Sequence, residues 1–504
     1  MTETQESGYT RICLISQAAN QKFIPRGIYF MPNIQQVTGY LPDERPPIWK
    51  LLLYAIQQVI VMFPATVAVA IITGFHISTT IFASGLATIC FLLVTGKQIP
   101  LYYGSSFSYI AAIGGLMSSE ALLGATLDEK IAVAQFGIVM SGLVSIAAGL
   151  IVKRFGKDSI EKVLPATVTG PIAMVIGLTL AGNALKDAAS IVVSADPQGN
   201  AILAASDAQA ALAANMAWIV ALVTLLSTIL FSVYLKGVGG QLPLLLGPIL
   251  GYITAFIIEI ATGIDLFRVL PESTAGNAIF AFPTFTLPKP SWMAVAAIMP
   301  IAIATIPEST AHVYQLDIYV NDLAKKKDVK KKYNIADKLG LNLIGDGIGD
   351  IISGFIGGPA GTNYGENISA MAITKVFSVS VLIMASILAM VISCFTPLVN
   401  AIYSIPYSVI GGLEIYLFGA IAVQGIAIMV EKKVDLFSSK NIAVIATIMI
   451  IGLGGQYGFG GNIPFFGAEI PCVAGAAIFG ILLNLALSIG EKKNKTDAKA
   501  EIAE

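Results

Sequence analysis

The chain contains repeated apolar runs that match the length needed to cross a lipid bilayer. A membrane-spanning helix needs about 20 predominantly apolar residues, and runs of about this length occur at Leu51–Thr73, Met216–Leu235, Val379–Phe395 and Ile442–Gly454. Only 12% of the 504 residues are charged, about half the usual share in soluble proteins. So few charges cannot cover a water-soluble particle of this size. The sequence therefore predicts an all-α polytopic membrane protein.

Composition also argues against several other classes. The formal net charge of −1 gives no attraction to nucleic acid, so we expect no nucleic-acid partner. The four cysteines are scattered and show neither metal-ligand spacing nor a disulfide framework. No nucleophile–base set, metal cluster or cofactor loop is visible, so we expect no enzyme, no metal and no cofactor. The segment from Met1 to about Arg45 lacks the features of a signal peptide, and we expect it to remain in the cytoplasm.

Basic clusters alternate with acidic segments along the chain. Lysine and arginine collect in loops on the cytoplasmic side of membrane proteins, which places both termini inside and predicts a multi-pass protein of the cell membrane with about 12 to 14 crossings. The basic loops are Lys97, Lys153–Lys162, Lys236, Lys325–Lys332, Lys432–Lys433 and Lys492–Lys495.

Two segments, Lys97–Phe107 and Gly357–Glu366, are too rich in Gly, Pro and polar residues to be good membrane helices. Non-helical backbone at membrane depth is tolerated only where it is buried or lines a cavity. Paired interruptions in the two halves of a chain point to a transporter's binding site. The stretch beginning Tyr103-Gly104 also aligns with the one beginning Tyr364-Gly365. We therefore expect two inverted repeats, divided near residue 290.

Ionisable residues inside the apolar segments are the candidates for function. Asp, Lys or Arg at a helix centre costs about 2.5–3.5 kcal/mol on insertion scales. Glu308 lies in an otherwise apolar helix, and His312 lies four residues later on the same face. Glu366 lies at the start of a half-helix after the second break. Asp346 and Asp350 lie one turn apart, and for them a packing role and a transport role both remain open.

Such a site has a recognisable ligand chemistry. The N-termini of half-helices present backbone N–H donors, and ionised carboxylates are acceptors. A small planar ligand with both C=O and N–H edges, such as a nucleobase, would match the two sets. Amino acids and carboxylates fit less well, because no intramembrane Lys or Arg is available to bind them.

The segment Tyr364–Lys375 resembles the signature of the nucleobase–ascorbate transporter family, also called nucleobase:cation symporter-2, and within it the uracil permeases. The similarity extends from about residue 47 to 489. Two departures from the family pattern are Ser369, where Gly is usual, and Pro64 in the first helix. Further matches are Gln57 with Met62–Thr66, Gly104–Phe107, Glu308 with His312, and Lys433–Asp435.

This resemblance implies fourteen helices in two inverted seven-helix repeats, with helices 3 and 10 interrupted by short extended segments. It also implies a core domain and a gate domain. The expected divisions are a cytoplasmic leader (1–46), core helices 1–4 (47–160), gate helices 5–7 with the outer loops (161–290), core helices 8–11 (291–397), gate helices 12–14 (398–490) and a cytoplasmic tail (491–504).

The resemblance further implies the residues of the site. Glu308 and Glu366 would accept from ring N–H groups, and Glu308, His312 and Glu366 would handle the coupled proton. The other implied site residues are Phe107 and Gly365 through their backbone N–H groups, Ala65 and Tyr364 as pocket wall, and Ser106.

The expected function is proton-coupled import of uracil by alternating access, with a homodimer as the expected assembly. A xanthine, urate or other purine permease of the same family is the first alternative. A sulfate or bicarbonate exchanger of the same fold is the second, although it should lack the pair of glutamates.

Overall fold

The computed structural model describes residues 39–156, 163–195, 201–206, 209–236, 239–270, 278–466 and 468–501. Within these ranges, eleven helices are long and apolar enough to cross a membrane, and the shorter apolar helices Phe107–Met117 and Val379–Ser393 accompany them. The prediction of a helical, multi-pass membrane protein is confirmed.

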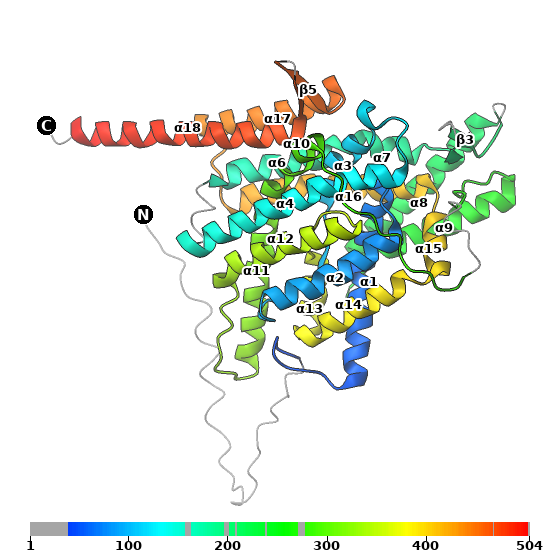
Figure 1. Ribbon diagram of the computed structural model, residues 1–504, viewed down its shortest axis with the longest axis horizontal. Helices are drawn as coiled ribbons and strands as arrows, with labels where there is room; N and C mark the ends of the chain where they lie inside the picture. Colours follow the sequence, from blue (N-terminus) through cyan, green and yellow to red (C-terminus); the bar gives the residue numbers. More distant parts are fainter. Residues whose placement is uncertain are drawn as a thin grey trace, which may run out of the picture. The chain divides into compact units, whose positions relative to one another are not determined.

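The helices, which are labelled individually in Figure 1, form two groups by their packing contacts. In the first helix group, α4 packs along α12, and α2 packs against α14 and α12. This group contains α1 (Ile48–Thr73), α2 (Ile77–Val94), α3 (Ile110–Met117), α4 (Leu127–Phe155), α10 (Trp292–Ile298), α11 (Ile301–Lys326), α12 (Leu339–Ile356), α13 (Gly365–Thr374) and α14 (Val379–Ser393).

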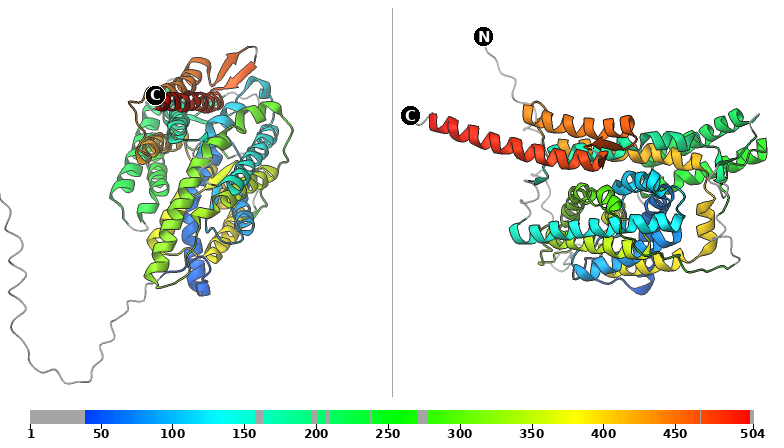
Figure 2. Two further views of the ribbon diagram at one scale, coloured as in Figure 1. Left: turned by 90° about the vertical axis from the view of Figure 1, so that its left-hand side faces the viewer. Right: turned by 45° about the horizontal axis from the view of Figure 1, so that its top comes forward.

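In the second helix group, α16 packs against α6, α7 and α8, while α17 packs against α18 and α6. The right-hand view of Figure 2 shows this group, largely red, orange and green, above the blue, cyan and yellow helices of the first group. Its members are α6 (Ala166–Thr179), α7 (Ala181–Ala188), α8 (Ala210–Tyr234), α9 (Pro243–Thr262), α16 (Tyr407–Glu431), α17 (Ser439–Phe459) and α18 (Cys472–Glu501), and α15 (Thr396–Tyr403) precedes α16.

Glycines allow the closest helix contacts within each group. A Cβ on Gly142 of α4 would overlap the backbone oxygen of Gly347 on α12, and a Cβ on Gly347 would overlap that of Gly142. Gly170 of α6 and Gly425 of α16 face each other in the same way. Small residues at a crossing let helix backbones approach closely in the membrane, where packing drives association.

The two predicted breaks are extended and pair with each other. Strand β1 (Tyr103–Ser105) runs antiparallel to β4 (Gly361–Asn363), with Gly104 opposite Thr362. Backbone bonds continue the pairing on both sides, since Ser106 N–H donates to the Ala360 oxygen at 2.9 Å and Tyr364 N–H to the Tyr102 oxygen at 2.9 Å. The expected short extended segments are confirmed. After β1 the chain forms the 3-10 turn η1 (Phe107–Tyr109) and α3, and after β4 it forms α13.

In its described residues, the segment 182–214 contains most of α7, a small hairpin and the start of α8. The hairpin is made of β2 (Val192–Ala195) and β3 (Ala201–Leu203). A second hairpin, β5 (Asn462–Phe465) with β6 (Ala468–Pro471), joins α17 to α18.

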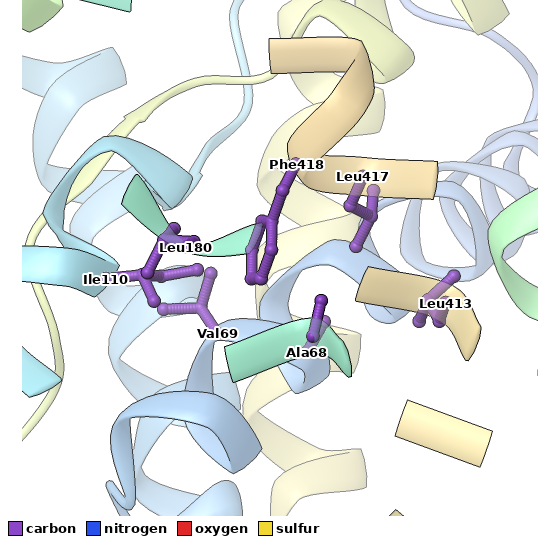
Figure 3. Close-up of a cluster of buried hydrophobic side chains, with 8 residues drawn as sticks. Ala68, Val69, Ile110, Leu180, Leu413, Leu417 and Phe418 are labelled. Carbon is purple, nitrogen blue, oxygen red and sulfur yellow. The ribbon is translucent and has the colours of Figure 1, made fainter. Parts of the chain in front are cut away.

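One buried cluster of apolar side chains joins the two helix groups, and Figure 3 shows it in close-up. We call it the apolar seal. Ala68 and Val69 of α1 and Ile110 of α3 come from the first group. The second group contributes Leu180, Ala184, Leu413, Leu417 and Phe418. Because burying apolar surface excludes water, this contact keeps water out of the part of the boundary that it occupies.

Candidate functional site

A cavity of about 340 Å³ lies between the two helix groups, within the usual range for small-ligand sites. The first group contributes the strands, η1, α11 and α13, and the second group contributes α6 and α16. The lining residues are Ser105, Phe107, Ser108, Thr169, Ala173, Ile176, Ala304, Pro307, Glu308, His312, Thr362, Asn363, Tyr364, Gly365, Glu366, Ser369, Leu417, Ala420, Ile421, Gln424 and Ile428.

A second hollow, of about 450 Å³, is lined by residues between Asp317 and Lys332. It is open to the surface and holds none of the predicted site residues. The 340 Å³ cavity is therefore the candidate site, because the intramembrane carboxylates gather there.

Two glutamates from different elements face this cavity. Glu308 lies in the third turn of α11, and Glu366 is the second residue of α13. Both side chains are half-buried, and they lie close enough to act on each other electrostatically. The cavity thus has two acidic side chains in its lining.

His312 lies one turn after Glu308 on α11 and also lines the cavity. A Cβ on Gly365 would lie 2.9 Å from the His312 Nε2 atom, so the imidazole rests against the start of α13. Its Nδ1 atom is buried and has no hydrogen-bond partner among the described residues. The structure therefore brings the predicted Glu308, His312 and Glu366 together.

Tyr364 holds the two breaks against α1. Its hydroxyl donates to the Ser105 backbone oxygen at 2.9 Å and lies 2.9 Å from the Thr66 hydroxyl. Tyr364 is also the N-cap of α13 and makes no side-chain cap bond there. The Tyr364 side chain therefore does not cap the first N–H groups of α13.

Two of the predicted site residues do not line the cavity. Ala65 is buried within α1 and is 1% exposed. Ser106 is also buried, and its hydroxyl accepts the Ser108 N–H at 3.3 Å instead of facing the cavity. The predicted Phe107, Tyr364 and Gly365 do line it.

A buried polar network behind the cavity was not predicted. The Asn342 amide donates to the Ser309 hydroxyl at 2.7 Å and to Asp346 at 3.1 Å. Asn363 donates to Ser309 at 3.1 Å and to the Asn342 oxygen at 3.2 Å, and Ser309 donates to Asp346. The network ties α11 and α12 to β4. Its signal in the sequence was weak, because single Asn and Ser residues occur in many membrane helices.

Asp350 has a clear structural role. It accepts the Tyr103 hydroxyl at 2.5 Å and the Gly361 N–H at 2.8 Å, one from each strand. Of the two roles left open for this residue, the packing role is the one that these contacts describe. Gln424 of α16 is a further polar lining residue that the sequence did not single out.

Long apolar helices, paired interrupted segments and a cavity with carboxylates between two helix groups define a membrane transporter rather than an enzyme. The model of the Permease family, which includes the xanthine and uracil permeases, matches residues 49–461. The chain belongs to this family, the nucleobase–ascorbate transporters that its signature resembles.

Two named relatives match most of the chain in sequence. A uracil permease of Bacillus caldolyticus is 34% identical over 452 residues, which cover 88% of this chain and 94% of the relative. A uracil permease of Escherichia coli (strain K12) is 31% identical over 444 residues, covering 88% of this chain and 92% of the relative.

Solved structures share the fold at low identity. The transmembrane domain of the cyanobacterial bicarbonate transporter BicA aligns with a TM-score of 0.51 and 15% identity, covering 88% of this chain and 98% of that one. The overall structure of SLC26A9 aligns with a TM-score of 0.56 and 12% identity, covering 88% of this chain and 64% of that one. The present chain thus spans less than two thirds of SLC26A9.

Proposed function

We propose that this protein is a proton-coupled symporter that imports uracil across the cell membrane by alternating access. The observation that carries the proposal is the meeting of Glu308 and Glu366 with the N-terminus of α13 in one cavity. Uracil is small and planar, with two ring N–H donors and two carbonyl acceptors. The glutamates would accept from the N–H groups, and the N–H groups of Phe107, Gly365 and Glu366 would donate to the carbonyls.

The relatives support this substrate, because both are named uracil permeases. The fold is shared with a bicarbonate transporter. An anion is a poor ligand for this cavity, however, because like charges repel strongly where water is scarce. Xanthine, urate and other purines are the competing substrates within the family, and a direct competition decides between them and uracil.

Proton coupling is assigned to Glu308 and His312, with Glu366 as their neighbour. An apolar surrounding favours the neutral form of a carboxyl group, so Glu308 can gain and lose a proton as the cavity changes its exposure. Coupling follows if uracil binds best to one protonation state, because a ligand shifts an equilibrium only through its differential affinity.

The two helix groups supply the moving parts in this proposal. In it, the first group would form the core domain (47–160 and 291–397), and the second the gate domain (161–290 and 398–490). The eleven long helices together with α3, α13 and α14 would make fourteen crossings in two inverted repeats. The apolar seal would close the outer side, and alternating access would require the core to move away from the gate there. Cytoplasmic termini and a homodimer complete the proposal.

The decisive experiment is uptake of radiolabelled uracil into proteoliposomes, with and without an inward proton gradient. We expect gradient-driven uptake that unlabelled uracil blocks and that xanthine and sulfate do not. Uptake that xanthine blocks better than uracil would move the substrate to the purine branch. Uptake that is insensitive to the gradient would reject proton coupling.

A further inference from the structure

Glu414 is a further intramembrane carboxyl group that does not line the cavity and that no part of the proposed transport mechanism uses. It lies in the outer half of α16 as we orient the chain, and its side chain is 0% exposed. Neither of its oxygens has a conventional hydrogen-bond donor among the described residues. An ionised carboxylate buried without a partner is very costly, so this side chain must be compensated in another way.

The compensation comes from Asp187 at the end of α7. Helix α7 packs along α16, and the Asp187 and Glu414 side chains lie near enough to act on each other. The backbones of the two helices touch at this point, because a Cβ on Gly411 would overlap the backbone nitrogen of Ala188. Two carboxyl groups held together in this way can form a hydrogen bond only if one of them carries a proton.

Burial decides which of the two carries it. Asp187 is half-buried, whereas Glu414 is 0% exposed, and the cationic side chains Lys186 and Arg268 lie on the Asp187 side of the pair. Arg268 is fixed nearby, with its Nε donating to the Ile405 oxygen at 2.7 Å and its guanidinium 4.9 Å from the Tyr407 ring centroid. A negative charge therefore costs less on the half-buried Asp187 than on the fully buried Glu414, and the proton belongs on Glu414.

Among the described residues, few other ionisable groups lie on the helices around the pair; on α16 itself, Tyr416 bonds the Ser232 hydroxyl and Tyr407 stacks with Arg268. Of the other helices packed on α16, α6 has no ionisable side chain and α8 has only Tyr234. Helix α9 has Tyr252 and Glu259, and neither acts on the pair.

We propose that Glu414 and Asp187 form a proton-binding site within the second helix group, separate from the Glu308–Glu366 cavity. The proton resides on Glu414 and is donated to the Asp187 carboxylate. Loss of this proton would place two negative charges in contact between α7 and α16. The same stretch of α16 carries Leu413 and Leu417 of the apolar seal, which Figure 3 shows on α16. The protonated pair thus holds α7 against α16 where the two helix groups meet.

The test is the pH dependence of thermal unfolding, measured on the purified full-length protein in detergent without substrate. A proton that the folded state keeps and the unfolded chain releases makes the protein less stable as pH rises, by about tenfold in the folding equilibrium per pH unit. Glu414→Gln removes this proton, so its melting temperature should fall less steeply with pH than that of the wild type. The control Glu259→Gln, on neighbouring α9, should follow the wild-type slope.

Asp187→Asn provides an independent variant at the half-buried end of the pair. It removes both the acceptor and the neighbouring charge, so the pH-dependent loss of stability should move to lower pH by about one unit. A double variant, Glu308→Gln with Glu366→Gln, tests the cavity separately. Its melting temperature should still show the part of the dependence on pH that Glu414→Gln abolishes.

The proposal is overturned if Glu414→Gln and wild type show parallel pH profiles. Should Glu414→Gln not yield folded protein, an unshifted profile for Asp187→Asn overturns it equally. The measurement needs neither uracil nor a gradient, so its outcome is independent of the proposed transport function.

Discussion

The Tyr364 hydroxyl donates a hydrogen bond of 2.9 Å to the backbone oxygen of Ser105, and so joins the two interrupted segments of the chain. The ring lies directly against Gly104, where a Cβ would overlap the ring carbons. The ring has no freedom to move aside, because its hydroxyl also bonds the Thr66 hydroxyl. Only glycine at position 104 permits this contact.

We therefore expect Gly104→Ala to destabilise the protein by about 1–3 kcal/mol, the usual cost of overpacking, and to reduce uptake strongly. Thermal unfolding and transport in proteoliposomes would measure the two effects. Gly114→Ala is the matched control, since a Cβ there meets nothing within 4 Å. In helix α3, Gly114→Ala should leave the free energy of unfolding unchanged or raise it by up to about 1 kcal/mol. Equal behaviour of the two variants would contradict the packing argument.

Asn367 links the start of α13 to α1. Its amide donates to the Gln58 backbone oxygen at 3.0 Å and to the Gln58 side-chain oxygen at 2.8 Å, and both residues are buried. Asn367→Ala leaves these acceptors unsatisfied, which costs about 1–3 kcal/mol and should lower the melting temperature. Ser369→Ala is the control, because its exposed hydroxyl bonds only the Gly365 oxygen of its own helix. A melting temperature for Asn367→Ala no lower than that of Ser369→Ala would show that the link is not needed.

The parts of the fold that follow from local chemistry were accessible from the sequence. The apolar runs predicted the membrane-spanning helices, and the Gly- and Pro-rich breaks predicted the extended segments. Glu308, His312 and Glu366 stood out because charge is costly in the bilayer. By the same criterion Glu414 should have been noticed, since it interrupts the apolar helix Tyr407–Glu431.

Other features depend on tertiary contacts that no local pattern encodes. The pairing of β1 with β4 joins residues more than 250 positions apart in the sequence. Ser106 matched a motif, but its hydroxyl turned to cap η1. The hydrogen bonds of Asn342 with Ser309 and Asp346 depend on the packing of α11 against α12, which the sequence does not show.

Glu308 is the residue on which proton coupling depends in the proposed function. Glu308→Gln keeps the shape of the side chain and an acceptor oxygen but cannot titrate. We expect it to lose accumulation of uracil against a gradient, while exchange of labelled for unlabelled uracil at equal concentrations persists. Both can be measured in the same proteoliposomes. If the variant still concentrates uracil, the proton must bind elsewhere. Asp265→Asn, an exposed carboxylate outside the helices, serves as the control.

The segment before α1 is fixed to the segment after α11 by Asp43. This carboxylate accepts from Lys331 at 2.6 Å and from the Tyr333 hydroxyl at 2.5 Å. Burial acts to raise the pKa of Asp43, but the hydrogen bonds from Lys331 and Tyr333 outweigh it, so the pKa lies below its ordinary value. A carboxyl group with a lowered pKa stabilises the folded state above its unfolded pKa, and this contribution disappears as the pH falls through the folded pKa.

Asp43→Asn should therefore lower stability at neutral pH by about 1 kcal/mol, a value kept small because the ion pair is exposed and screened. The difference from wild type should shrink as the pH is lowered below the ordinary range for an aspartate. Thermal unfolding over an acidic pH series measures it. Asp322→Asn is the matched control, because its i,i+4 pair with Lys326 is exposed on both sides and involves no buried tyrosine. A difference between Asp43→Asn and wild type that stays constant with pH would show that the charge on Asp43 contributes nothing, and that only the shape of the side chain matters.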